Sequence, residues 1–159
     1  MTKYWLLKSD PAYFSIDDLR IAPHQTTDWD GIRNYQARDF IREMSVGDQA
    51  FFYHSNCNPP GIIGITEVVS EAYPDLTAVN PKSKDFDAKS TPENPLWYTI
   101  DICFKEKFKD LLPLDLIKRY PELASMPLLP EGNQLSVLPI SEAEWVFIIQ
   151  ELLPGYYKR

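Results

Sequence analysis

Short strand-like segments recur along this chain, and long helices do not alternate with them in a regular series. The segments are residues 4–7, 49–54, 62–69, 96–104 and 135–138. A doubly wound parallel sheet needs a covering helix between successive strands, so this order argues against that architecture. The sequence instead predicts an α+β fold, in which a mixed, curved sheet or small barrel is flanked by helices.

The best-defined helix is predicted to follow Asn34. Ala37, Phe40, Ile41 and Met44 are spaced i, i+3, i+4 and i+7, so they form one apolar stripe along a helix. Asn34 stands where an N-cap residue accepts a hydrogen bond from the free amides of the first turn. The stripe indicates that one side of this helix packs against the sheet.

Further helices are predicted near both ends of the chain, and two long stretches are predicted to be loops. Ser15 and Ser141 each precede an acidic residue by three positions, a pattern typical of a capping box that opens a helix. A short helix is predicted after Pro113. Residues 21–33 and 74–95 show no clear period, and long loops inside compact domains often carry function.

Length and charge set the broad class of the protein. At 159 residues the chain is expected to fold as a single domain over residues 1–153, with a loose tail at 154–159. The formal net charge of −7 weighs against broad, nonspecific binding of nucleic acid, which depends on Lys and Arg neutralising phosphates. A local basic surface is still compatible with this charge.

Nothing in the sequence resembles a leader peptide or a membrane segment. The N-terminus carries no long apolar run, and no stretch approaches the ~18 apolar residues of a membrane span. Cys57 and Cys103 are too few for a disulfide framework and are expected to be reduced. We therefore expect an intracellular protein, cytoplasmic or, in a eukaryote, nuclear, without a membrane partner.

Sequence patterns for catalysis or cofactor binding are weak. His54 and Cys57 lie three residues apart at a strand end, a spacing that does not by itself bring a nucleophile and its base together. The only histidines are His24 and His54, without zinc-type spacing, and there is no glycine-rich phosphate loop. We expect no catalytic residues, no metal site and no cofactor.

Large rings are combined with amides and hydroxyls at the ends of several predicted elements. Trp29 lies in a polar loop, and Trp97 opens a strand. Two such rings could stack on a planar ligand, while Asn34, Ser55 and Asn56 meet its edge. Equally, the tryptophans could cap the core while Asn34 only caps its helix. The residue types alone leave both interpretations open.

Blocks of residues along nearly the whole chain resemble the EVE domain family. The longest block is Trp29-Asp30-Gly31-Ile32-Arg33-Asn34-Tyr35-Gln36-Ala37-Arg38, and others are Lys8-Ser9-Asp10-Pro11, Phe52-Tyr53-His54-Ser55-Asn56-Cys57, Asn94-Pro95-Leu96-Trp97 and Leu135-Ser136-Val137. The resemblance implies a PUA-like fold, a mixed β pseudo-barrel flanked by helices, similar to the YTH and ASCH domains.

The same resemblance implies a non-catalytic reader of modified nucleobases, with modified cytosine in DNA favoured and RNA left open. It places the ligand-binding residues at Lys8, Ser9, Trp29, Asn34, Tyr35, Ser55, Asn56 and Trp97. Arg33 and Arg38 are expected to contact phosphates. Gln134 stands where family members often carry an arginine, which predicts weaker phosphate binding because the charged fork is lost.

Two other functions remain open at this point. Similarity to ASCH domains suggests hydrolysis of an amide on a modified nucleoside, with Lys8 as a base or activator. A small-ligand or protein-interaction module would use the same barrel without nucleic acid, and would lack a continuous basic surface beside the pocket. The sequence predicts no oligomeric state.

Overall fold

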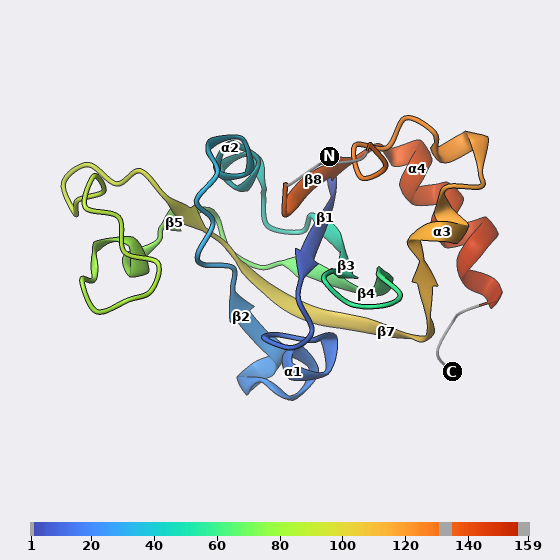
Figure 1. Ribbon diagram of the computed structural model, residues 1–159, viewed down its shortest axis with the longest axis horizontal. Coiled ribbons are helices and arrows are strands. Elements are labelled where there is room, and N and C mark those ends of the chain that lie inside the picture. The colour runs from blue at the N-terminus through green and yellow to red at the C-terminus, as the bar shows by residue number, and fades with distance from the viewer. Residues whose placement is uncertain (1, 131–134, 156–159) are drawn as a thin grey trace.

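A curled, mixed sheet of six strands forms the centre of the molecule (Figure 1). The structure, a computed structural model, describes residues 2–130 and 135–155. The strands follow the spatial order β2-β7-β4-β3-β1-β8. Their bounds are β1 (Tyr4–Ser9), β2 (Thr26–Asp28), β3 (Gln49–His54), β4 (Gly61–Val68), β7 (Asp101–Pro113) and β8 (Val137–Ile140). The β1–β3 pair is parallel, and the other neighbouring pairs are antiparallel.

α-Helices flank the sheet, and their starts follow from the sequence. Their bounds are α1 (Ile16–Ile21), α2 (Tyr35–Glu43), α3 (Leu114–Ile117) and α4 (Glu142–Phe147). Asn34 caps α2 by accepting from the Ala37 N–H at 3.0 Å. Ser15 and Ser141 form the capping boxes that open α1 and α4. These three starts confirm the sequence predictions, and α4 continues through one π-helical segment, Ile148–Leu152.

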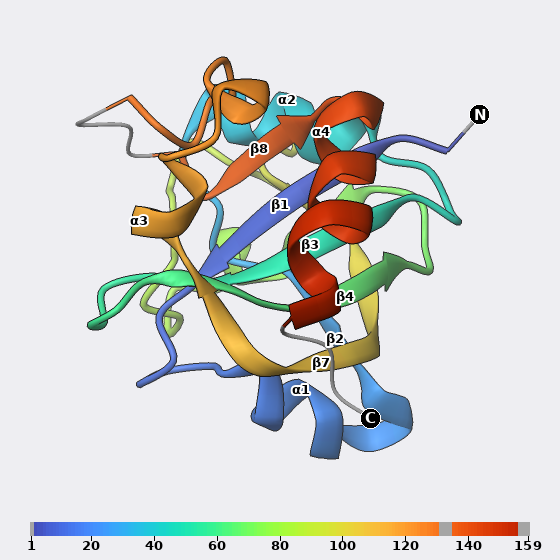
Figure 2. The ribbon, with the colours of Figure 1, turned by 90° about the vertical axis from the view of Figure 1, so that its right-hand side faces the viewer.

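Two hydrophobic cores form because neighbouring residues of a strand point to opposite faces of the sheet. Leu6 and Phe51 belong to one core, where the Phe51 ring stacks on Trp145 of α4 with centroids 4.0 Å apart. Trp5 and Phe52 belong to the other core, which also contains residues of α1 and α2. Figure 2 shows α4 lying across the strands on the first of these faces.

The sheet curls where β4 pairs irregularly with the long strand β7. Their register shifts between Ile62 and Gly64 and again between Ile65 and Thr66. A Cβ at Gly64 would collide with the carbonyl oxygen of Glu106, so glycine is needed for the two backbones to approach this closely. The result is the α+β, PUA-like mixed pseudo-barrel that the sequence predicts.

Two sequence predictions about this sheet were wrong. Residues 21–33, predicted to be a loop, contain β2, which pairs with β7 at the edge of the sheet. Residues 96–104, predicted to be one strand, are divided between β6 (Tyr98–Thr99) and β7, which runs on to Pro113. β2 is short and polar, so it has no hydrophobic period to reveal it.

The second half of β7 was missed for a different reason. Charged residues alternate at Lys105, Lys107 and Lys109, on a stretch that faces water along one side. The buried residues Phe108 and Leu112 are spaced too widely to show a strand without the partner β4. A strand with one face exposed to solvent contains many polar residues, so its sequence resembles that of a loop.

Residues 75–97 form an arm that projects beyond α2 at the left of Figure 1. The arm begins and ends at a small antiparallel sheet of β5 (Tyr73–Pro74) and β6. Apart from a 3-10 turn at Leu76–Val79, the arm has no helix or strand, which confirms the long loop predicted for residues 74–95 except at Pro74, which belongs to β5. Within the described residues, no helix combines the length and the apolar character needed to span a membrane.

Candidate ligand-binding cleft

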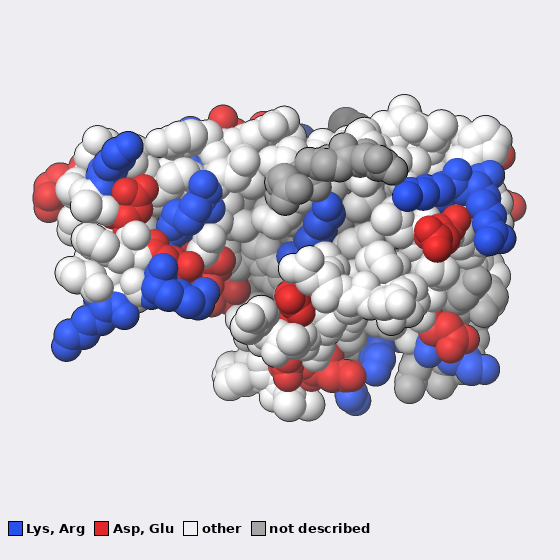
Figure 3. Space-filling model, viewed as in Figure 1, with Lys and Arg blue, Asp and Glu red and all other residues white. Residues whose placement is uncertain are grey.

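An open cleft of about 750 Å³ lies between the end of β1, the turn that follows it and the residues after β2. Its lining residues are Lys8, Ser9, Asp10, Tyr13, Phe14, Thr27, Asp28, Trp29, Asp30, Ile32, Lys84 and Ser136. Lys84 belongs to the arm, so the arm forms part of the rim. Figure 3 shows the surface hollowed between the arm and the rest of the molecule, with charges of both signs at the border.

Lys8 brings a positive charge into the cleft, where none of the described acidic residues forms an ion pair with it. Its Nζ lies 5.9 Å from the centroid of the Tyr53 ring on the neighbouring strand. None of the ion pairs among the described residues involves Lys8. Burial lowers the pKa of Lys8 because its ammonium group loses solvation. A half-buried, unpaired cation of this kind is suited to meet an anionic or carbonyl oxygen of a ligand.

The turn after β1 is fixed by its own hydrogen bonds. Ser9 Oγ donates to the carbonyl oxygen of Phe14 at 2.6 Å, and the Phe14 N–H donates to Asp10 O at 2.9 Å. The Phe14 ring packs edge-on against Trp29, with centroids 6.5 Å apart. One side of the cleft is therefore held firmly against the tryptophan.

Trp29 forms the aromatic wall of the cleft, and only 8% of its surface is exposed. Its ring meets Phe52 of β3 with centroids 5.7 Å apart and an interplanar angle of 84°. Its backbone N–H donates to Ile100 O at 2.9 Å, which ties the segment after β2 to the sheet. These contacts fix the orientation of the indole ring within the cleft.

The cleft also contains carboxylates that the sequence did not predict as site residues. Asp28 and Asp30 flank Trp29, and burial raises the pKa of both carboxyl groups. Nearby acidic side chains add to the shift, Asp101 for the first and Asp28 for the second. Their position directly beside Trp29 in the sequence is the signal that could have found them. Lys84 gave no such signal, because only the folded arm brings it to the cleft.

Trp97, predicted to stack on the ligand, is not among the residues that line this cleft. Its ring stacks on Tyr35 with centroids 4.9 Å apart, and its indole N–H donates to Asp87 Oδ2 at 2.7 Å. Only 4% of Trp97 is exposed. The structure thus pairs Trp97 with Tyr35 rather than with Trp29, because the end of the arm packs against the start of α2.

The predicted polar contacts lie at the ends of elements, outside the lining of the cleft. Asn34 uses its side-chain oxygen to cap α2. Ser55 follows β3, and its N–H donates to Ser9 O at 2.9 Å. Asn56 adopts a left-handed φ of 53°, a conformation that asparagine tolerates in tight turns. Of the predicted ligand-binding set, the cleft brings together Lys8, Ser9 and Trp29.

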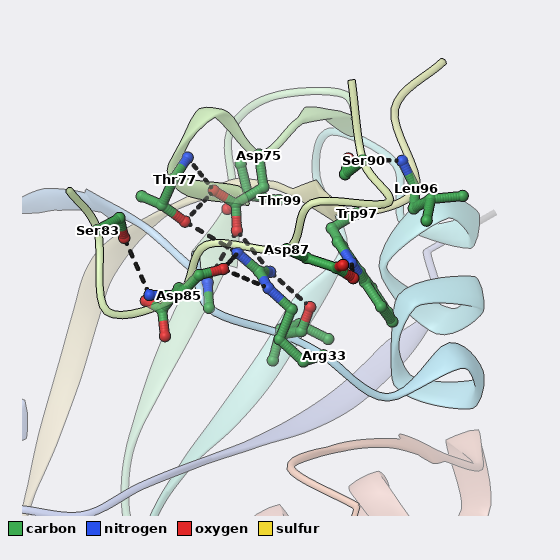
Figure 4. A network of polar contacts seen from close by, with 12 residues as sticks. Arg33, Asp75, Thr77, Ser83, Asp85, Asp87, Ser90, Leu96, Trp97 and Thr99 are labelled. Carbon is green, nitrogen blue, oxygen red and sulfur yellow. Dashed lines mark hydrogen bonds and ion pairs between the residues drawn. The ribbon is translucent and has the colours of Figure 1, made fainter. Parts of the chain in front are cut away.

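Arg33, predicted to contact a phosphate, is the hub of an internal network (Figure 4). All five N–H groups of a guanidinium have acceptors here. The acceptors are Asp85 O for Nε and Nη2, Ile32 O and Asp75 Oδ2 for Nη1, and Thr77 Oγ1 for Nη2. The buried Asp75 also accepts from the Gly31 N–H at 2.8 Å. The network clamps the arm to the segment that carries Trp29.

Arg38, the other predicted phosphate contact, is also engaged within the protein. Its Nη1 donates to Leu96 O at 3.1 Å, and its Nη2 pairs with Asp39 at 2.9 Å. The guanidinium lies over the Tyr35 ring, 4.9 Å from the centroid. The cations that line the cleft are instead Lys8 and Lys84. Gln134, expected to weaken phosphate binding, lies outside the described residues.

His54 and Cys57 are arranged differently from a catalytic pair. His54 Nε2 accepts from the Ile16 N–H at 3.1 Å, and burial lowers the pKa of the imidazole. Burial raises the pKa of the Cys57 thiol. Both shifts favour neutral groups, whereas a reactive cysteine needs its thiolate. Cys57 and Cys103 are free thiols, as expected. The described residues contain no His, Cys, Asp and Glu cluster placed to hold a metal ion.

The curled sheet, with helices on its faces, defines a PUA-like domain. The family profile described as the EVE domain matches residues 3–151 of the sequence. The chain belongs to the EVE domain family.

Similar proteins occur in animals and bacteria. Thymocyte nuclear protein 1 of Gallus gallus is 43% identical over 163 residues, which cover 92% of this chain and 67% of that protein. A crystal structure of a Pseudomonas syringae protein is 47% identical, with a TM-score of 0.87, and covers 92% of this chain and 97% of its own. The crystal structure of human THYN1 protein in complex with 5-methylcytosine-containing DNA is 40% identical in sequence, with a TM-score of 0.88. The match covers 93% of this chain and 96% of the human chain.

Proposed function

We propose that this protein is a non-catalytic module that binds a modified nucleobase in the cleft beside Trp29, with modified cytosine in DNA favoured. The observation that carries the proposal is the relative with the same fold and 40% identity, human THYN1 protein, whose structure is a complex with 5-methylcytosine-containing DNA. The cleft supports it independently, because it combines an indole wall, an unpaired lysine and hydrogen-bonding side chains.

In this proposal one nucleotide leaves its stack and enters the cleft. Extruding a base costs a few kcal/mol, and stacking on an aromatic side chain returns on the order of 1–3 kcal/mol. Trp29 stacks on the base, Lys8 meets a phosphate or carbonyl oxygen, and Ser9 Oγ accepts from the base edge. A methyl group adds modest discrimination, about 1–3 kcal/mol, because an apolar contact with one carbon is weak.

The remaining predicted residues support the cleft in this proposal rather than touch the base. These residues hold the arm, the start of α2 and the end of β3 in place. The set consists of Asn34, Tyr35, Ser55, Asn56, Trp97, Arg33 and Arg38. An intracellular location belongs to the same proposal, since both cysteines are free.

Titration with matched oligonucleotides tests the proposal. Two oligonucleotides would differ only in one cytosine or 5-methylcytosine, and we expect the methylated one to bind about 5- to 100-fold more tightly. Lys8→Met and Trp29→Leu should each weaken binding, with thermal unfolding used to check that the variants fold. Lys109→Met removes an exposed lysine of β7 as the matched control. The proposal would be contradicted if both oligonucleotides bound equally tightly and Lys8→Met left that binding unchanged.

The alternative function is that of an ASCH-like hydrolase, and the lowered pKa of Lys8 is the observation in its favour. Burial lowers the pKa of Lys8, which increases the fraction of neutral amine that can act as a base. Incubation with N4-acetylcytidine separates the two functions. Release of cytidine that Lys8→Met abolishes would establish the hydrolase, whereas saturable binding without product would support the reader.

A further inference from the structure

We propose that Tyr13, in the turn after β1, supplies the second aromatic surface of the cleft and stacks on the bound base. The inference rests on the proposed function and deepens it, because it names a residue that covers the base together with Trp29. Tyr13 lines the cleft and leaves 87% of its surface exposed. A flat ligand has two faces, and a ring of this kind can cover one of them.

A ring this exposed contributes little to the stability of the fold, since aromatic side chains stabilise proteins mainly through the area that they bury. Single exposed apolar residues are common on protein surfaces, so exposure alone assigns no role. Phe86 on the arm, for example, is 42% exposed and does not line the cleft. Tyr13 differs because its exposed ring stands in the lining of the cleft.

The turn that carries Tyr13 is held in place on both sides of the ring. The Tyr13 N–H donates to Asp10 O at 2.9 Å, and Ser9 Oγ donates to Phe14 O at 2.6 Å. The Phe14 ring anchors the turn by packing against Trp29, with centroids 6.5 Å apart. Because the backbone is already fixed, the Tyr13 ring loses only side-chain freedom when it stacks, which favours binding.

The other aromatic rings near the cleft already pack against rings of the protein itself. Trp97, the second ring predicted from the sequence, is covered by Tyr35 at 4.9 Å. Phe14 lines the cleft but packs edge-on against Trp29. Among the aromatic residues that line the cleft in the described structure, Tyr13 has by far the most free surface.

Two ligands test this inference: a single-stranded oligonucleotide with one 5-methylcytosine, and free 5-methylcytidine. Tyr13→Ala is expected to weaken binding of both by about 5- to 100-fold, because the lost contact is with the base itself. Tyr13→Phe keeps the ring and is expected to bind like the wild type. Phe86→Ala removes an exposed ring outside the cleft and should leave both affinities unchanged. The melting temperature of each variant reports on folding.

The outcomes separate this inference from the proposed function. If the wild type binds and Tyr13→Ala binds equally tightly, the inference is overturned while the proposed function stands. If Tyr13→Ala weakens binding of the oligonucleotide but not of free 5-methylcytidine, Tyr13 contacts the rest of the strand rather than the base, and the inference is again overturned. If the wild type binds neither the oligonucleotide nor the nucleoside, the proposed function fails and the inference fails with it.

Discussion

Lys8 holds an ammonium group in a half-buried position where no carboxylate of the described residues pairs with it. Burial lowers the pKa of Lys8, so the charged ammonium is less favourable in the folded chain than in the unfolded chain. The folded pKa therefore lies below the unfolded value of about 10.4, and at neutral pH the charge opposes folding. In the proposed function, a ligand oxygen compensates this charge when the ligand binds.

Replacing Lys8 should separate stability from binding. We expect Lys8→Met to raise the free energy of unfolding by up to about 1 kcal/mol, a modest gain because solvent screens a half-exposed group. The same variant should bind the methylated oligonucleotide more weakly. Urea denaturation at pH 7.5 and titration measure the two effects, and Lys109→Met should change neither by more than about 0.5 kcal/mol. Lower stability with normal binding would contradict this account of Lys8.

His54 makes a pH-dependent contact between β3 and α1. Its Nε2 accepts from the Ile16 N–H, which requires that this nitrogen carry no proton. Burial lowers the pKa of His54 in the folded chain. The stabilisation is therefore fully present above the unfolded pKa of about 6.5 and is lost as the pH falls below it.

The free energy of unfolding should consequently drop between pH 7.5 and pH 5.5 more in the wild type than in His54→Gln. The glutamine side-chain oxygen can accept the same hydrogen bond at both pH values. Urea denaturation at constant ionic strength measures the difference, with the exposed His24→Gln as the control. A wild type and a His54→Gln variant with the same pH dependence would refute the role of this contact.

At the scale of elements, the arm depends on its clamp to the segment before α2. Arg33 donates to the buried Asp75 at 3.1 Å and to the backbone of Asp85. Lysine has the charge but not the planar fork, so it cannot reach all of these acceptors at once. A buried carboxylate that loses its partner costs several kcal/mol.

We expect Arg33→Lys to lower the free energy of unfolding by roughly 1–3 kcal/mol and to loosen the arm. Trypsin should then cut faster at the lysines of the arm, which are Lys82, Lys84 and Lys89. Arg20→Lys alters an exposed ion pair with Asp17 and should cost less than about 0.5 kcal/mol. Unchanged stability and unchanged cleavage in Arg33→Lys would mean that the network does not hold the arm.

The elements with local signals were predictable from the sequence, and those that depend on distant partners were not. Asn34 caps α2 through a residue three positions away, so the cap is visible in the sequence. Tyr35 and Trp97 stack across a long separation in sequence, so their pairing appears only in the fold. For the same reason the sequence could name Trp29 as a wall of the cleft but not Lys84 as part of its rim.

At the scale of the whole molecule, the net charge of −7 and the internal use of Arg33 and Arg38 limit the phosphate contacts. Lys8 and Lys84 are the cations that line the cleft. Each neutralised phosphate contributes a slope of roughly −0.9 to log K against log salt for duplex DNA. We expect a slope no steeper than about −2 for the methylated oligonucleotide, from titrations at several salt concentrations. A slope of about −5 would require a broad basic surface and contradict this account.

The central claim is that a modified base binds beside Trp29, and the indole N–H resonances of the chain's 4 tryptophans test it directly. Trp145 stacks on Phe51 in the core on the α4 side and serves as an internal control. When the 5-methylcytosine oligonucleotide is added to 15N-labelled protein, the Trp29 signal should shift in a saturable way while the Trp145 signal stays in place. A saturable shift at another tryptophan with the Trp29 signal unchanged would contradict the claim.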